Sequence, residues 1–190
     1  MNFEILEKFE WYNDPENVRF KDEGMEVFAK YNTDFWQCLQ RGFKKDNGHF
    51  FYCRQNGDFE FVLKWSVSSK DVVGQCGVMV RMDERNWCKA SFEKEASGEN
   101  IITSSLTNMG HSEWSKGASL GNVDEVWFKV VRVLDEYAFY YSVDGVEFFK
   151  FKMFYLKSFE DIKVGAYMGC SSEEDFCAVV SDIEIGCLEE

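Results

Sequence analysis

The chain has 190 residues, of which 45% are hydrophobic and 17% aromatic, and its formal net charge is −13. Disordered chains are poor in aromatic residues, so this chain is predicted to fold. The acid excess argues against nucleic acid or a membrane as a partner, because both are negatively charged. No repeat of solenoid period and no linker-like segment interrupts the sequence, so residues 1–190 are predicted to form a single domain.

The N-terminal segment is acidic, with Glu4, Glu7 and Glu10. A signal peptide requires a basic start and an uninterrupted apolar stretch. No run in the chain approaches the ~20 apolar residues that span a bilayer. We therefore expect a cytoplasmic protein.

Alternation of period two dominates the chain and predicts β-strands. In the first half it appears in residues 57–69, where Phe59, Phe61, Leu63 and Trp65 share one face, and then in residues 77–82. A polar hairpin connection over residues 82–87 leads into residues 86–95, and residues 99–109 are predicted to form the next strand.

The second half contains long strands at residues 123–134 and 136–143, then a hairpin at Asp144 and Gly145. An Asp-Gly pair between alternating runs is a strong hairpin signal. Residues 162–169 and 176–186 make the last two strands, and residues 158–162 could form one helical turn. Many strands joined by short polar turns indicate an all-β fold, a two-sheet antiparallel β-sandwich.

Seven cysteines are dispersed through the chain without a close pair. Zinc sites usually place two ligands a few residues apart, so we expect neither a metal nor another cofactor. In a reducing compartment these residues are predicted to be free thiols that fill the core.

One strand raises the question of function. In residues 86–95, alternation places Trp87, Lys89, Ser91, Glu93 and Glu95 on one face. The other face carries Cys88, Ala90, Phe92 and Lys94, of which Cys88 and Phe92 are predicted to lie in the core. Aromatic faces and hydrogen-bonding side chains are the groups that bind sugars.

The order of motifs along the chain resembles that of the YesU-like family, a domain of unknown function related to the fungal "regulation of enolase" protein. The resemblance covers almost the whole chain and rests on residues 34–37 (DFWQ), 47–52 (NGHFFY), 57–67, 74–93, 104–115, 127–145 and 164–176. It implies a concanavalin A-like jelly roll of the lectin and glucanase superfamily. The chain departs from the family pattern at Gly74, Cys76 and Glu113.

The resemblance and the sugar-binding chemistry together select a set of candidate ligand-binding residues on the concave sheet. Trp87 and Trp114 are expected to stack, and Lys89 and Arg81 to favour an acidic sugar such as a uronate. The full predicted set is Trp36, His49, Gln75, Arg81, Trp87, Lys89, Glu93, Asn108 and Trp114. The predicted ligand is a saccharide or a similar polyhydroxylated molecule.

Other interpretations of the same residues remain open. Lys89, Glu93 and Arg81 could form cross-strand ion pairs that only stabilise the sheet. Glu93, with Glu95 two residues along the strand, could serve a glycoside-active enzyme, although the longer signature of related glucanases is absent. The domain could instead bind a protein partner and regulate a metabolic enzyme, as the fungal relative's name suggests.

Overall fold

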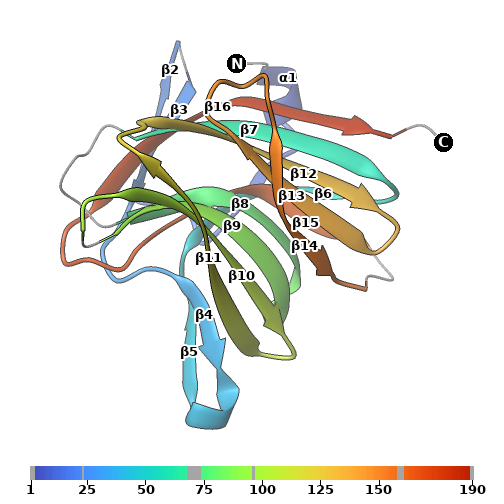
Figure 1. Cartoon of the computed structure of the whole chain (residues 1–190), viewed down its shortest axis with the longest axis horizontal. Coiled ribbons are helices and arrows are strands. Elements are labelled where there is room, and N and C mark those ends of the chain that lie inside the picture. Colours follow the sequence, from blue (N-terminus) through green and yellow to red (C-terminus); the bar gives the residue numbers. More distant parts are fainter. Residues whose placement is uncertain (1–2, 23, 68–73, 96, 158–160, 189–190) are drawn as a thin grey trace.

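Two antiparallel sheets enclose the core of the protein, with alternating apolar side chains between them (Figure 1). The computed structural model describes residues 3–22, 24–67, 74–95, 97–157 and 161–188. The predicted β-sandwich is therefore confirmed. The helical turn predicted over residues 158–162 lies largely outside the described residues. Two short helical segments are present, α1 (Phe3–Leu6) and the 3-10 turn η1 (Leu39–Arg41).

Nine strands form the first sheet, sheet A. In spatial order they are β1 (Glu10–Tyr12), β6 (His49–Gln55), β15 (Ile162–Cys170), β8 (Gly74–Asp83), β9 (Asn86–Lys94), β10 (Asn100–Asn108), β11 (His111–Gly121), β4 (Phe35–Cys38) and β5 (Phe43–Asp46). Seven strands form sheet B, in the order β14 (Phe149–Tyr155), β13 (Glu136–Ser142), β12 (Glu125–Val133), β7 (Phe59–Val67), β16 (Phe176–Cys187), β3 (Gly24–Ala29) and β2 (Asn17–Lys21).

The core follows the predicted alternation. Phe59, Phe61, Leu63 and Trp65 of β7 are at most 1% exposed and face sheet A. The indole N–H of Trp65 donates to the Gly77 carbonyl at 2.9 Å, which satisfies its polar atom inside the core. The seven cysteines are thiols that form no disulfide, as predicted, and four of them are buried in the core: Cys53, Cys76, Cys88 and Cys170.

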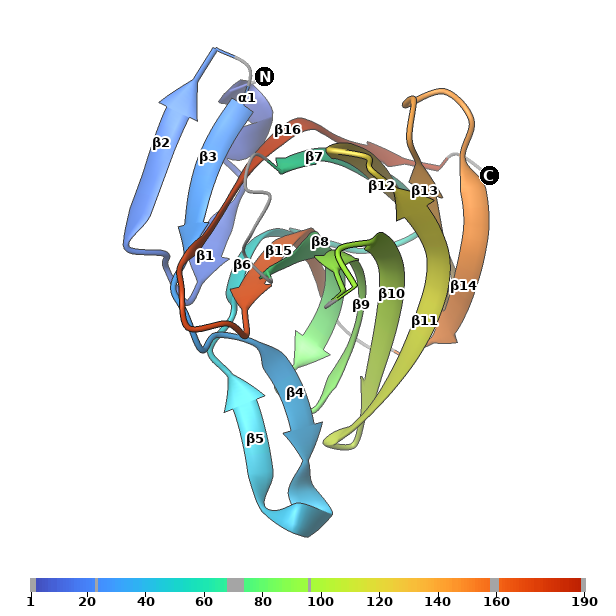
Figure 2. The same ribbon diagram turned by 60° about the vertical axis from the view of Figure 1, so that its left-hand side comes forward.

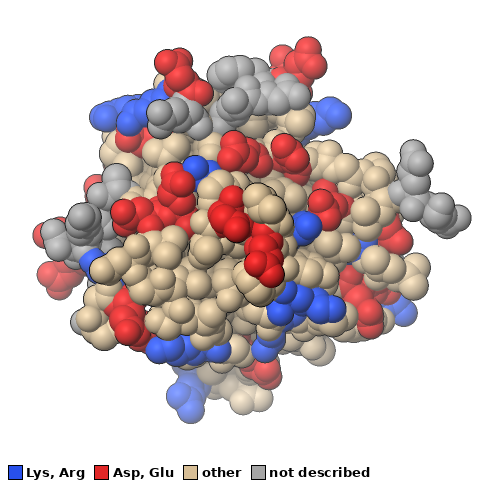
Figure 3. All heavy atoms as spheres, turned by 45° about the horizontal axis from the view of Figure 1, so that its top comes forward, with Lys and Arg blue, Asp and Glu red and all other residues tan. Residues whose placement is uncertain are grey.

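The outer face of sheet B carries paired charges. Acidic and basic side chains are interspersed on the side of the molecule shown in Figure 3. Lys64 contacts Glu125 at 2.7 Å, and Lys129 contacts Glu60 at 3.5 Å across neighbouring strands. This pattern is typical of a solvated sheet face. Among the described residues, no helix has the length and apolarity needed to cross a membrane.

The hairpin β4–β5 lies on the side of sheet A that points away from sheet B (Figures 1 and 2). Strand β4 pairs with β11 of sheet A at a single residue pair, Cys38 with His111, near the turn of the hairpin. The opposite end of the hairpin, at Phe35 and Asp46, crosses toward the central strands, where Phe35 packs against Trp87 and Tyr167. The hairpin therefore covers part of the outer face of sheet A.

Candidate functional site

The outer face of sheet A brings most of the predicted site residues together. Gln75 lies opposite Glu93, and Arg81 lies opposite Trp87, so these side chains share one face with Lys89. The alternation predicted for residues 86–95 is confirmed, because Cys88, Ala90 and Phe92 lie in the core.

Trp114 belongs to the same face through its cross-strand register. It lies opposite Ser105, which in turn lies opposite Lys89. Strands in a sheet are about 4.8 Å apart, which places Trp114 about 10 Å from the Lys89 strand. The side chain of Trp114 is 48% exposed, so this edge of the face is open to solvent.

Three of the predicted residues lie elsewhere. Trp36 alternates with the buried Phe35 and Gln37 of β4 and so points away from the sheet. His49 lies opposite the core residue Met168 and hydrogen-bonds the Asn13 carbonyl through Nδ1 at 2.8 Å. Asn108 has the inward-facing alternation of Leu106, and it lines a cleft between the sheets.

The structure corrects the role predicted for Trp87. This side chain is fully buried in a small apolar cluster beneath the hairpin, packed edge-on against Phe35 at 6.3 Å between ring centroids. A buried ring cannot stack on a ligand, so Trp87 supports the hairpin instead of binding a sugar. The local alternation was predicted correctly, but the segment that covers the face comes from about 50 residues earlier in the chain.

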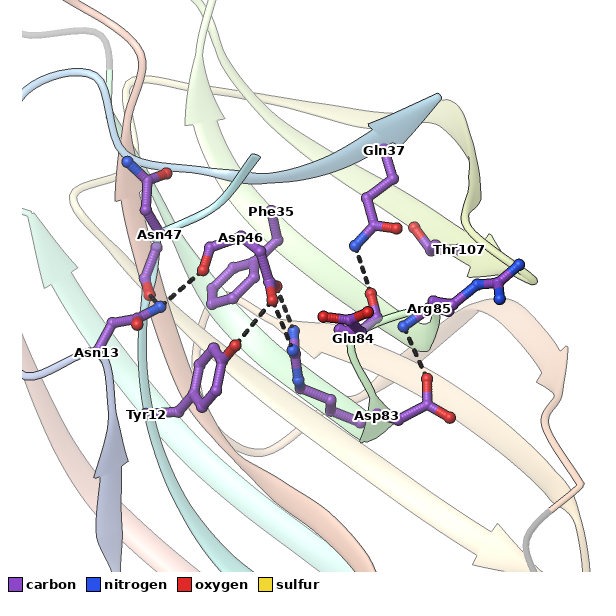
Figure 4. Close-up of polar contacts among 12 residues, drawn as sticks. Tyr12, Asn13, Phe35, Gln37, Asp46, Asn47, Asp83, Glu84, Arg85 and Thr107 are labelled. Atoms are coloured by element: carbon purple, nitrogen blue, oxygen red, sulfur yellow. Dashed lines mark hydrogen bonds and ion pairs between the residues drawn. The ribbon is translucent and has the colours of Figure 1, made fainter. Parts of the chain in front are cut away.

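Arg81 is held in an ion pair with the hairpin. Its guanidinium donates to both carboxylate oxygens of Asp46, at 2.7 and 3.0 Å, and it stacks over the ring of Tyr12 at 4.4 Å. The Tyr12 hydroxyl also donates to the Asp46 carboxylate, at 2.7 Å (Figure 4). Burial and this hydrogen bond raise the pKa of Tyr12. The arrangement fastens β5 to the sheet.

A second polar network surrounds Lys89, which is 2% exposed. Its ammonium donates to Asp34 Oδ1 at 3.0 Å and to Gln75 Oε1 at 2.9 Å, and it lies 4.8 Å from the centroid of the Tyr167 ring. The Tyr167 hydroxyl donates to Gln75 Oε1 at 3.1 Å and contacts Ser91 Oγ. The alternative of ion pairs among Lys89, Glu93 and Arg81 is therefore wrong, because Lys89 pairs with Asp34 and Arg81 pairs with Asp46.

Two carboxylates border this network, and hydrogen bonds from neighbouring side chains fix one oxygen of each. Asp34 Oδ1 accepts hydrogen bonds from Gln75 and Lys89, and Glu93 Oε1 accepts one from Thr103 at 2.5 Å. Burial, followed by the charges of Glu93 and then Asp34, raises the pKa of Tyr167 well above its usual value. Both carboxylates therefore act on the same buried hydroxyl.

Glu93 and Glu95 contact different partners and do not act as a pair. Glu95 lies beyond the end of β9 and forms an ion pair with Lys116 at 2.7 Å. Asp34, and not Glu95, is the carboxylate that shares the network with Glu93. Among the described residues, no group of three or more His, Cys, Asp or Glu side chains is placed to hold a metal ion.

Sequence reasoning missed Asp34, Asp46, Tyr12 and Tyr167 as members of the site. Their contacts join positions 34 to 92 residues apart in the chain, and no local periodicity reports such pairs. The motif at residues 34–37 was the available signal, because an acidic residue stands directly before the aromatic pair.

Comparison with known proteins identifies a family and relatives that match most of the chain. The family described as "Protein of unknown function (DUF1349)" matches residues 11–187. "Regulation of enolase protein 1" from Saccharomyces cerevisiae is 34% identical over 121 residues, which are 63% of this chain and 60% of that protein. A crystal structure of a functionally unknown protein from Saccharomyces cerevisiae is 26% identical, with a TM-score of 0.86 over 97% of this chain and 99% of that one.

More distant structures share the fold alone. The legume lectin-like domain from Entamoeba histolytica is 8% identical, with a TM-score of 0.66 over 100% of this chain and 94% of its own. The GH43 protein BlXynB from Bacillus licheniformis (K247S mutant) has a TM-score of 0.73 at 12% identity, over 95% of this chain and 37% of its own. The resemblance inferred from the motifs is confirmed, and the chain belongs to the DUF1349 family of proteins of unknown function.

Proposed function

We propose that the protein binds a neutral polyhydroxylated ligand, such as an oligosaccharide, on the outer face of sheet A. The ligand lies between Trp114 and the two carboxylates Asp34 and Glu93. The observation that carries this proposal is the exposed indole of Trp114, two strands from a buried polar network that orients two acceptors. The rest of the proposal follows from the chemistry of these groups.

Trp114 provides the apolar platform. Sugars present C–H surfaces that stack on aromatic faces, and an indole is large enough to cover one ring. A tryptophan side chain has only two torsion angles, so it loses little conformational freedom when it binds. The sequence predicted that both Trp87 and Trp114 stack on the sugar, and in this proposal Trp114 stacks alone.

Asp34 and Glu93 provide the acceptors. Among the described residues, each has one oxygen with hydrogen-bond partners and one without. The Asp34 side chain is 19% exposed and Glu93 is half-buried, so their second oxygens are available to hydroxyl donors. A carboxylate that is already held by internal bonds accepts a ligand hydroxyl without further ordering cost.

A neutral ligand fits the charge of the face better than a uronate. Lys89 and Arg81, which the sequence analysis assigned to an acidic sugar, are buried and paired with Asp34 and Asp46. Neither cation offers free positive charge, and Lys116 is paired with Glu95. These two lysine and arginine side chains therefore do not favour a uronate over a neutral sugar.

Calorimetric titration with cello-oligosaccharides and oligogalacturonides tests the proposal. We expect the neutral series to bind and the acidic series to bind at least ~10-fold more weakly, a difference of about 1.4 kcal/mol. Trp114→Ala should lose at least ~10-fold in affinity, whereas Trp36→Ala, on the far side of the hairpin, should keep it. Heat from neither series would contradict the proposal.

Two alternatives give different results in the same experiment. A glycoside-active enzyme would release reducing ends, and Glu93→Gln would bind the sugar without turnover. A regulatory module, the alternative favoured by the name of the yeast relative, would bind purified enolase and no saccharide. Binding without product release supports the proposal over both.

A further inference from the structure

A cleft of about 370 Å³ opens between the two sheets at the side where β11 and β14 face each other. It lies on the opposite face of β10 and β11 from the site around Trp114. Ser104, Leu106 and Ser115 form its sheet A wall, and Lys152 and Phe154 form its sheet B wall. Both wall strands can be followed in Figure 2, where β11 and β14 run next to each other.

The walls of this cleft have polar residues at positions that face the sandwich interior. Ser104 lies opposite the core residue Ala90, and Ser115 lies opposite Ser104. The neighbouring inward position of β10 is occupied by Ile102, a core residue. Polar groups at interior positions are costly unless they find partners. The sandwich is therefore open and polar at this edge.

Lys152 supplies a cation that lacks a carboxylate partner. Its ammonium donates to Ser115 Oγ at 3.1 Å and lies 5.8 Å from the Phe154 ring centroid. No ion pair of Lys152 occurs among the described residues, although the chain carries a net charge of −13. A half-buried ammonium that has a hydroxyl neighbour and no ion pair among the described residues is a site for an anionic group.

The rest of the cleft lining combines apolar and polar side chains. Leu106 and Phe154 form an apolar surface beside Lys152, and Tyr155 adds a ring at the mouth. Glu113 and Asn108 line the sheet A wall farther along and are exposed, so they can accept a donor group. The volume lies at the lower end of the ~300–1,000 Å³ range of small-molecule sites.

We infer that this cleft binds a small organic acid with an aromatic or apolar body and a hydroxyl group. The carboxylate contacts Lys152 and Ser115, the body packs on Leu106 and Phe154, and the hydroxyl donates to Glu113. This site is separate from the proposed saccharide site and does not depend on it.

Titration of ¹⁵N-labelled protein with 4-hydroxyphenylacetate tests the inference. We expect saturable shifts of the backbone amides of Leu106, Ser115, Lys152 and Phe154 up to about 10 mM probe, which detects dissociation constants in the millimolar range. The uncharged amide, 4-hydroxyphenylacetamide, should bind at least ~10-fold more weakly because it lacks the charge that Lys152 pairs with.

Two lysines of β14 provide a matched pair of variants. Lys152→Met should weaken the probe at least ~10-fold, whereas Lys150→Met should not, because Lys150 pairs with Tyr140 on the outer face of sheet B. Trp114→Ala should leave the probe affinity unchanged, which separates this site from the saccharide site. Equal binding of acid and amide, shifts that persist in a folded Lys152→Met, or no shifts at all would each overturn the inference.

Discussion

Trp87 and Trp114 stand on the same face of sheet A and differ completely in their surroundings. Trp87 is fully buried beneath Phe35, and Trp114 is 48% exposed. Period-two alternation assigns a residue to a face, but it does not report what lies over that face. The candidate residues could therefore be predicted as a row, whereas the division between support and binding surface could not.

His49 shows the same limit for a polar residue. Its place in a motif made it a candidate ligand-binding residue, but the residue is 6% exposed and its Nδ1 is hydrogen-bonded to the Asn13 carbonyl. Burial lowers the pKa of His49 below its ordinary value of 6.5. The folded protein therefore favours the neutral ring.

This shift predicts a pH dependence of stability. Because the folded pKa lies below the unfolded pKa of 6.5, the contribution of His49 is complete above that value and is lost as the pH falls through the folded pKa. We expect the unfolding free energy of wild type, minus that of His49→Gln, to decrease between about pH 7.5 and about pH 5.5.

Urea unfolding of both proteins across this range measures the difference. The subtraction removes the titration of groups common to both proteins. A difference that stays constant, or that grows as the pH falls, would show that His49 is not held neutral by burial.

At the scale of elements, the strands of the second half follow the sequence closely. The break between β12 and β13 falls at Leu134 and Asp135, and the hairpin into β14 contains Gly145 at a φ of 74°. Such boundaries are predictable because they depend on local turn chemistry. The hairpin β4–β5 is different, because its position depends on distant contacts with Arg81 and Lys89.

The ion pair between Asp46 and Arg81 is predicted to hold that hairpin on the sheet. Asp46→Asn leaves the Arg81 guanidinium buried without its counter-charge, which should cost ~3–5 kcal/mol of unfolding free energy. The side chain of Arg81 is 1% exposed and that of Asp46 is 9% exposed, so solvent screening is small.

Lys44→Met, on the same hairpin, is the matched control. Lys44 and Glu84 form an exposed pair at 2.6 Å, and such pairs contribute under ~1 kcal/mol. Urea denaturation of both variants gives the comparison. If Asp46→Asn cost no more than Lys44→Met, the hairpin would not be fastened by the buried pair.

At the scale of the whole molecule, composition and alternation were sufficient to predict a two-sheet antiparallel β-sandwich, and the motifs were sufficient to predict its family. Close contacts between strands were not predictable. A Cβ at Gly77, for example, would lie 1.9 Å from the Ala90 carbonyl oxygen, so only glycine fits there. Because the charges on sheet B are paired and the cations on sheet A are neutralised, we propose Asp34, Glu93 and Trp114 as the groups that would contact a ligand.

Mapping a bound neutral oligosaccharide on the protein shows directly whether the outer face of sheet A around Trp114 binds it. In ¹⁵N spectra of the protein titrated with cellotetraose, we expect saturable shifts of the Trp114 indole N–H and of the backbone amides of Asp34, Glu93 and Thr103. Those of Lys152 and Phe154 should stay unchanged. Saturable binding whose shifts lie elsewhere, or no binding at about 10 mM sugar, would contradict the proposal.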